Sequence, residues 1–404
     1  MISVSDALST MADAIVPVQS REVPVRRGLG CAAAEPVCAA SSLPSFAQSA
    51  MDGYALRADD VADARPTAPV ALDVVGEAQV GAGATAPALG AGEAVKISTG
   101  AAIPQGADAV VRRERVECDG SEVRISHAVA RGRDVRPVGE ELDRGEPLVE
   151  PGTRLDEGRL AILSMTGVGR LEARPAPSVT ILVSGDEVVG PDAERQPGEV
   201  YDANGPLLVN WVRSRTGATA EVTTLPDDVD ETRRTMASAL STSDLVVSTG
   251  GVSVGDDDHL GDAAEELGAR DSFWRVAQKP GKPVYFGVVD DTPYLGLPGN
   301  PGAAFVGAHV YLQRAVDCLQ GLDDPGPTPV PCRLTGTVER SSSRTRWVGA
   351  RVRSRGTEVR VRPVDGHRLG QLYDVDGLVS VPPGDGSVAS GDELDWIDRR
   401  IRSI

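Results

Sequence analysis

The segment DLVVSTGGVSVGDDDHLGDAAEEL, residues 244–267, decides the fold class of the chain. Its apolar run DLVVST leads through a glycine-rich turn into a stretch with helical spacing near 259–267, which indicates a buried strand followed by a helix. The same order recurs around it, with predicted strands at 179–184 and 221–225 and predicted helices at 204–216, 229–241 and 302–319. Alternating strands and helices form parallel sheets with right-handed crossovers, so we predict a doubly wound α/β domain over residues 175–322.

The sequence outside this domain has a different texture. Short alternating runs broken by glycine turns fill residues 69–127, and a similar pattern returns after the Pro/Gly-rich segment 323–331, so both regions are predicted to be rich in β-strands. Helical spacing outside the α/β region occurs at 3–15, with Ser3 or Ser5 as the cap, and at 157–165. With 404 residues the chain is too long for one core, and four structural regions are expected.

Composition excludes several classes of partner. The formal charge of −18 leaves no cationic footprint for nucleic acid, and no apolar run approaches the roughly 20 residues that span a bilayer. The N-terminus lacks the pattern of a signal peptide, so a cytoplasmic location is expected. An acidic surface with only three lysines suits the acidic proteome of a high-salt cytoplasm, and a GC-rich codon bias explains it equally well. Five scattered cysteines favour neither a disulfide framework nor a structural zinc site.

Four turns of the α/β region end predicted strands, and ligands bind beyond the carboxyl ends of strands in open parallel sheets. Glycines in these turns allow close approach of a ligand, and helix N-termini offer free N–H groups to an anion. Acidic side chains occupy the same turns, where a hard cation such as Mg²⁺ would hold them together; helix capping and the general excess of aspartate explain part of this cluster. The turns are SGDE (184–187), PDD (226–228), GGVSVGDDD (250–258) and LPGNP (297–301).

The lysines give a sharper indication. Two of the three, Lys279 and Lys282, lie within the pentapeptide KPGKP (279–283), although arginine replaces lysine almost everywhere else. Their compact ammonium groups, fixed by two prolines and a glycine, suit a phosphate or another tetrahedral oxyanion. Two further turns, SAMDGYA with Asp52 and ISTGA with Thr99, lie outside the α/β region.

Eight motifs then occur in a family-specific order: SAMDGYALR, ISTGAAIPQGADAVV, VRPVGEEL, LVSGDEVV, GEVYDANG, DLVVSTGGVSVGDDD, FWRVAQKPGKPVYFG and LGLPGNP. In this order the chain resembles the molybdopterin molybdotransferases, which include the catalytic domain of gephyrin, over about residues 3 to 395. The resemblance implies an elongated N-terminal dimerisation domain (1–50 and 134–174), an inserted β domain (51–133), the α/β molybdopterin-binding domain (175–322) and a C-terminal β-barrel (323–404).

The resemblance also implies a reaction. Family members are homodimers with an active cleft shared between subunits; they insert molybdate into adenylyl-molybdopterin, with Mg²⁺-dependent cleavage and release of AMP, to give molybdenum cofactor. The carried-over catalytic residues are Asp52, Thr99, Glu187, Asp227 and Asp258. Glu187, Asp227 and Asp258 are assigned to the metal, and the substrate-binding residues are Gly250, Gly251, Ser253, Lys279, Lys282, Pro298 and Pro301.

The barrel departs from the family pattern. Gly366 and Gly349 stand where a serine and an arginine are usual, so the barrel either loses its share of oxyanion binding or supplies it from His367, Arg368 or Arg351 instead. Two other functions stay open: a molybdopterin adenylyltransferase, which uses the same α/β domain, and a non-catalytic molybdopterin-binding scaffold. Either molybdate or tungstate fits the motifs.

Overall fold

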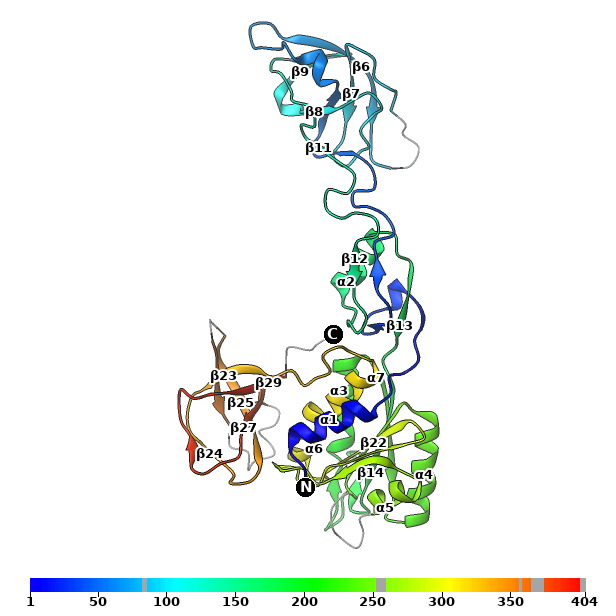
Figure 1. Ribbon diagram of the computed structural model, residues 1–404, viewed down its shortest axis with the longest axis vertical. Helices are drawn as coiled ribbons and strands as arrows, with labels where there is room; N and C mark the ends of the chain where they lie inside the picture. The colour runs from blue at the N-terminus through cyan, green and yellow to red at the C-terminus, as the bar shows by residue number, and fades with distance from the viewer. Residues whose placement is uncertain (82–85, 252–258, 356–357, 365–373, 400–404) are drawn as a thin grey trace. The chain divides into compact units, whose positions relative to one another are not determined.

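The structure is a computed structural model that describes residues 1–81, 86–251, 259–355, 358–364 and 374–399 (Figure 1). The chain forms two compact units. The first comprises Met1–Pro36, Val149–Leu160 and Arg170–Ile404, and the second comprises Val37–Leu148 and Ala161–Gly169. The four predicted domain boundaries remain predictions.

The α/β domain of the first unit is built on a six-stranded sheet of order β17-β14-β18-β22-β21-β19. The first four of these strands run parallel, as predicted. They are β14 (Ser178–Ser184), β17 (Thr219–Leu225), β18 (Leu245–Thr249) and β22 (Thr292–Leu297). The predicted helices are confirmed as α3 (Asn204–Thr216), α4 (Val229–Thr242) and α5 (His259–Glu266).

Alternate residues of the strands explain why helices cover both faces of this sheet. Ile181 of β14 belongs to a core that includes α3 and the helical segment 301–319. The next residue, Leu182, belongs to a second core, which includes α4 and α5. Both side chains are fully buried. An apolar strand without polar alternation is the pattern of a sheet that is buried on both faces.

Two strands at one side of this sheet run antiparallel to their neighbours. β21 (Tyr285–Val289) runs antiparallel to β22, and β19 (Arg270–Trp274), a strand that the sequence did not reveal, runs antiparallel to β21. β21 and β22 are joined by Asp290 and Asp291, whose φ values are 45° and 71°. Two residues with positive φ form a tight hairpin turn, and so short a link cannot make the crossover that parallel strands require.

The helical segment predicted at 302–319 is continuous but not uniform. It comprises α6 (Pro301–Gly307), a π-helical stretch (Ala308–Leu312) and α7 (Gln313–Leu319). The N-terminal helix α1 (Val4–Ala14) begins at Ser3, whose hydroxyl accepts a hydrogen bond from the Asp6 amide at 3.0 Å, so Ser3 is the cap. Ala7 and Met11 of α1 are fully buried in the same core as α7.

A closed five-stranded β-barrel follows in the C-terminal region. Its strands pair in the order β25-β26-β23-β29-β27, and β27 closes onto β25. They are β23 (Val330–Leu334), β25 (Thr345–Arg355), β26 (Val359–Pro363), β27 (Gly377–Val381) and β29 (Glu393–Asp398). A short strand from the α/β domain, β20 (Gln278–Lys279), pairs in parallel with β25.

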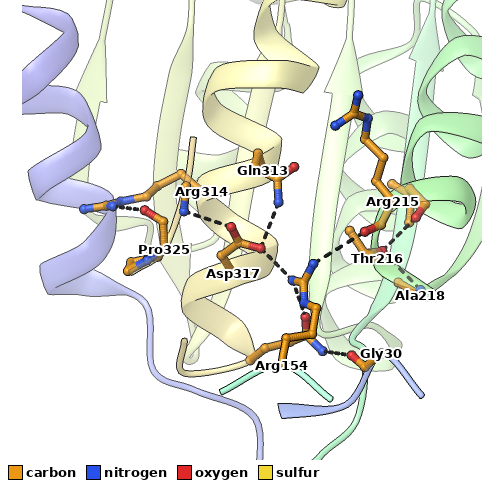
Figure 2. Close-up of polar contacts among 12 residues, drawn as sticks. Gly30, Arg154, Arg215, Thr216, Ala218, Gln313, Arg314, Asp317 and Pro325 are labelled. Atoms are coloured by element: carbon orange, nitrogen blue, oxygen red, sulfur yellow. Dashed lines mark hydrogen bonds and ion pairs between the residues drawn. The ribbon is translucent and has the colours of Figure 1, made fainter. Parts of the chain in front are cut away.

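The first unit also holds the segments through which the chain leaves for the second unit and returns. There β1 (Arg21–Pro24), β13 (Arg170–Arg174) and β2 (Ala32–Ala33) form a three-stranded sheet. Close by, Arg154 donates to the fully buried carboxylate of Asp317 on α7 at 2.7 Å, as Figure 2 shows. The helix α2 (Glu157–Met165) matches its predicted bounds.

The second unit contains the predicted small β module, a six-stranded sheet of order β8-β5-β7-β6-β10-β9. Its core is made of small and branched apolar side chains such as Leu56, Val111 and Ile125. The strands are β5 (Gly53–Leu56), β6 (Val70–Ala78), β7 (Glu93–Ile97), β8 (Ala109–Arg112), β9 (Val116–Asp119) and β10 (Glu122–Ile125).

Candidate functional site

The acidic turns after β14 and β17 are tied to each other at the carboxyl edge of the sheet. The carboxylate of Asp227 accepts a hydrogen bond from the Asp186 amide at 3.2 Å, and the carboxylate of Asp186 accepts one from the Asp227 amide at 3.0 Å. Both side chains are exposed, and each keeps oxygen lone pairs for another partner. Asp186, which the sequence reasoning left out, is therefore as much a part of this site as Asp227.

Neighbouring acids in these turns differ in role. Asp228 caps α4, because its carboxylate accepts from the Glu231 amide at 2.8 Å. The exposed carboxylate of Glu187 folds back over Gly185, where a Cβ would lie 2.6 Å from Glu187 Oε2. Helix capping thus explains the presence of Asp228. Among the described residues Glu187 makes no such cap, and it follows Asp186 directly in the chain.

The glycines after β18 allow three loops to meet. Gly250 has a φ of 87°, and a Cβ there would lie 2.8 Å from Ser184 Oγ. A Cβ at Gly299 would in turn lie 3.4 Å from the Cα of Gly250. Gly251 also has a positive φ, of 60°. Backbone therefore lies against backbone where β14, β18 and β22 end, which only glycine permits.

Asn204, the first residue of α3, holds these loops together, and the sequence reasoning missed it. Its amide nitrogen donates to Thr249 Oγ1 at 2.7 Å and to the Gly299 carbonyl at 2.8 Å. Its amide oxygen is buried without a hydrogen-bond partner within the described part of the chain. The motif GEVYDANG contains it, but nothing in the local pattern distinguishes this asparagine from an ordinary helix cap.

The lysine turn, residues 279–283, lies at the same edge because β21 is antiparallel. A strand that runs against β22 begins where β22 ends, and Tyr285 is paired with Gly296. A Cβ at Gly281 would lie 3.3 Å from Ala303 Cβ and 3.6 Å from Pro298 Cγ, so this turn packs on LPGNP. Pro298 is buried, and Pro301 begins α6.

Lys279 and Lys282 are both exposed, and neither forms an ion pair with any residue that the structure describes. Asp227 and the start of β21 are separated by four interstrand steps of about 4.8 Å, which makes roughly 19 Å along the edge. The acids and the ammonium groups therefore stand toward opposite ends of one row of loops. Such a row suits an elongated ligand with an anionic group at the ammonium end and a cation, free or bridging to a second anionic group, at the acidic end.

Two predicted members of the site, Ser253 and Asp258, lie outside the described residues. Among the residues that are described, no three His, Cys, Asp or Glu side chains form a group that could hold a metal ion. Mg²⁺ is ordinarily held by one or two carboxylates together with substrate phosphates, and the exposed Asp186–Asp227 pair supplies oxygen atoms of that kind.

Asp52 and Thr99 belong to the second unit, where the structure brings them together. Asp52 Oδ1 accepts from the Thr99 amide at 2.7 Å and from the Thr99 hydroxyl at 2.8 Å. These two bonds, with a smaller contribution from the charge of Arg113, lower the pKa of the exposed Asp52 carboxyl. At Gly53 a Cβ would lie 1.9 Å from the Val111 carbonyl oxygen, which explains the glycine after Asp52.

The barrel offers a physical reason for its departure from the family pattern. A Cβ at Gly349 would lie 2.8 Å from Val375 Cγ1, which leaves no room there for an arginine. Arg351 donates to the Asp374 carbonyl at 2.9 Å and pairs with the Asp374 carboxylate, so its charge is balanced locally. Gly366, His367 and Arg368 lie outside the described residues.

The fold and the site together define a doubly wound α/β domain with glycine-rich loops at the carboxyl edge of its sheet, where such domains bind their ligands, carried in one chain with two β-rich modules. Residues 180–317 match the family model described as a probable molybdopterin binding domain, and residues 2–167 match the MoeA N-terminal region (domain I and II).

Comparisons over the length of the chain agree. Molybdopterin molybdenumtransferase 2 of Mycobacterium tuberculosis is 30% identical over 400 residues, which cover 98% of each chain. The molybdopterin molybdenumtransferase of Haemophilus influenzae is 32% identical over 324 residues, 80% of this chain and 78% of the relative. A molybdopterin biosynthesis MoeA protein from Pyrococcus horikosii superposes with a TM-score of 0.83 at 29% identity, over 98% of this chain and 99% of that one. The chain belongs to the molybdopterin molybdenumtransferase family.

No helix within the described ranges is long and apolar enough to cross a bilayer.

Proposed function

We propose that this chain inserts molybdate into adenylyl-molybdopterin, with Mg²⁺-dependent cleavage of the phosphoanhydride and release of AMP. The chain is a transferase of molybdenum cofactor biosynthesis by family, and the details of the reaction are the proposal. The observation that carries it is the continuous row of loops from Asp227 through Gly250 to Lys282, which offers acids at one end and ammonium groups at the other.

The proposal assigns a task to each part of this row. The phosphate of the pterin lies against the turn at Gly250 and Gly251, where glycine lets a ligand approach the backbone closely. The Gly250 amide already donates to the Leu297 carbonyl at 3.2 Å, so the Gly251 amide is the donor to the phosphate. Lys279 and Lys282 attract the oxyanion, while the buried Pro298 shapes the floor beneath them. Mg²⁺, held by Glu187 and Asp227 together with Asp258, would neutralise the charge of the pyrophosphate when bound.

We further propose a homodimer in which Asp52 and Thr99 of one subunit serve the α/β site of the other. The Asp52 carboxylate is exposed, and its bonds to Thr99 hold it in one orientation, which suits a group that contacts a ligand bound to another chain. Mixing Asp52→Ala subunits with Lys279→Ala subunits tests this directly, since a shared site regains activity in the mixed dimer. Mixtures as inactive as the separate variants would contradict it. A cytoplasmic location stays a prediction.

The decisive assay is release of AMP from adenylyl-molybdopterin with molybdate and Mg²⁺. Lys279→Ala is expected to lower turnover at limiting molybdate, and Lys96→Ala is the matched control, because Lys96 pairs with Glu77 at 2.9 Å in the second unit. An adenylyltransferase would instead consume ATP and molybdopterin, and a scaffold would turn over neither. If Asp52→Ala, Asp258→Ala and Lys279→Ala all kept wild-type turnover, the site assignment would be wrong.

A further inference from the structure

A buried glutamine connects the lysine turn to the barrel. Gln278 precedes Lys279 and has no exposed surface. Its amide nitrogen donates to the Gly281 carbonyl at 2.7 Å, inside the lysine turn. Its amide oxygen accepts from Tyr311 Oη at 2.7 Å and from Trp347 Nε1 at 3.0 Å.

The partners of Gln278 come from three parts of the first unit. Gly281 belongs to the lysine turn, Tyr311 to the π-helical stretch after α6, and Trp347 to strand β25 of the barrel. Pairing of β20 with β25 reinforces this junction, because the Thr345 amide donates to the Ala277 carbonyl at 2.9 Å. The side chain of Gln278 is thus the point where the lysine turn, the helix and the barrel share hydrogen bonds.

Burial of the Gln278 amide is unfavourable unless its polar atoms have hydrogen-bond partners. An apolar side chain would fill the same volume without the cost of removing an amide group from water. Burial raises the pKa of Tyr311, so its hydroxyl stays protonated and available as a donor. A buried polar network in which both polar atoms of Gln278 have partners favours one arrangement of its members.

The turn itself needs such support. Gly281 has a φ of 83°, and the Lys282 carbonyl accepts from the amides of both Val276 and Val284, at 3.0 and 3.1 Å. The ammonium groups of Lys279 and Lys282 stand on flexible stems. The backbone of the turn sets the two points from which these stems extend, and so the region that both ammonium groups can reach.

We propose that Gln278 is a positioning residue, which fixes the lysine turn relative to barrel strand β25 and thereby sets the affinity of the site for the oxyanion. The barrel then contributes to oxyanion binding through Trp347 and this glutamine, without placing a side chain on the ligand. For its kinetic readout the inference rests on the proposed function.

The main test variant is Gln278→Met, which keeps the length of the side chain and removes both polar atoms. It is compared with Trp347→Phe and Tyr311→Phe, each of which removes one donor to Gln278. Tyr294→Phe is the matched control, since Tyr294 is equally buried and its hydroxyl bonds Ser248 Oγ at 2.7 Å, away from the lysine turn. We expect Gln278→Met to raise the half-saturating molybdate concentration about tenfold, equivalent to about 1.4 kcal/mol, with little change in kcat at saturating molybdate. The single-donor variants should show smaller rises, and Tyr294→Phe none.

Two readouts do not depend on turnover: calorimetric binding of molybdate alone, and hydrogen exchange of the Val276 and Val284 amides. Weaker molybdate binding together with faster exchange supports the inference. Unchanged molybdate affinity overturns it, even where exchange becomes faster, because a merely structural glutamine would behave in that way. If Gln278→Met does not fold, Trp347→Phe decides by the same criteria. Absence of AMP release by the wild type would refute the proposed function, while molybdate binding and exchange would still decide the role of Gln278.

Discussion

The buried ion pair between Arg154 and Asp317 gives the sharpest test of how the first unit is stabilised. The Asp317 carboxylate is 0% exposed and accepts from Arg154 Nη2 at 2.7 Å. Gln313 Nε2 and the Gly326 amide also donate to it, each at 2.8 Å. It therefore ties the segment that returns from the second unit to α7 and to the linker that leads into the barrel (Figure 2).

Asp317→Asn keeps the shape of this side chain and removes its charge. The new amide would point N–H groups at a site that now receives donors, and Arg154 would lose its counter-charge. Breaking a buried pair by removal of one partner costs about 3–5 kcal/mol. The side chain of Arg154 is 21% exposed and regains some hydration, so we expect the lower end, about 3 kcal/mol, or roughly a hundredfold in the unfolding equilibrium.

Urea unfolding followed by tryptophan fluorescence measures this change in the first unit alone, because all four tryptophans lie there: Trp211, Trp274, Trp347 and Trp396. The control is Glu358→Gln, which breaks an exposed pair with Arg333 at 3.0 Å and should leave the unfolding midpoint almost unchanged. The reasoning is refuted if Asp317→Asn shifts the midpoint no more than this control does.

Two further predictions concern the site. Thr99→Val removes one of the two donors to Asp52, so the pKa of Asp52, read from its carboxyl carbon by NMR, should rise toward the ordinary value. Because the pKa of Asp52 is lowered in the folded state, its bonds to Thr99 stabilise the fold at pH values above the ordinary aspartate pKa. This stabilisation disappears as the pH falls through the lowered pKa. An unchanged Asp52 pKa in Thr99→Val would mean that the Thr99 hydroxyl does not lower it. Gly250→Ala should lower thermal stability more than Gly268→Ala, since their φ values of 87° and 90° match but only the Gly250 Cβ meets other atoms, Ser184 Oγ at 2.8 Å and the Ser184 carbonyl oxygen at 2.9 Å. Equal losses in the two variants would mean that the contact with Ser184 has no weight.

Local pattern was sufficient for most elements of the α/β domain. The helix predicted at 204–216 has those bounds in the structure, and the strand predicted at 179–184 begins one residue earlier. The strand Arg270–Trp274 was missed because it lies at the outer edge of the sheet and carries charged as well as apolar residues. The direction of its partner β21 was not predicted, and it follows from the two-residue turn at Asp290 and Asp291, which makes β21 antiparallel to β22.

The candidate site also has residues that the sequence reveals and residues that only the structure reveals. Its motifs were visible because glycine, lysine and aspartate in strand-end turns are recognisable residue by residue, whereas Asn204 and Gln278 were not. Both act through partners that are distant in the chain: Asn204 through Gly299, and Gln278 through Tyr311 and Trp347. No local pattern marks an ordinary amide side chain whose partners are assigned only by packing.

The sequence by itself determined the fold class and the family, and it predicted the residue types of the ligand site, because hydrophobic period and turn chemistry are local properties. Tertiary structure alone decided that the lysine turn lies at the carboxyl edge of the sheet, since this follows from the antiparallel direction of β21. It also decided which buried amides support that edge, because a hydrogen bond between residues 278 and 347 exists only once the barrel strand pairs with β20.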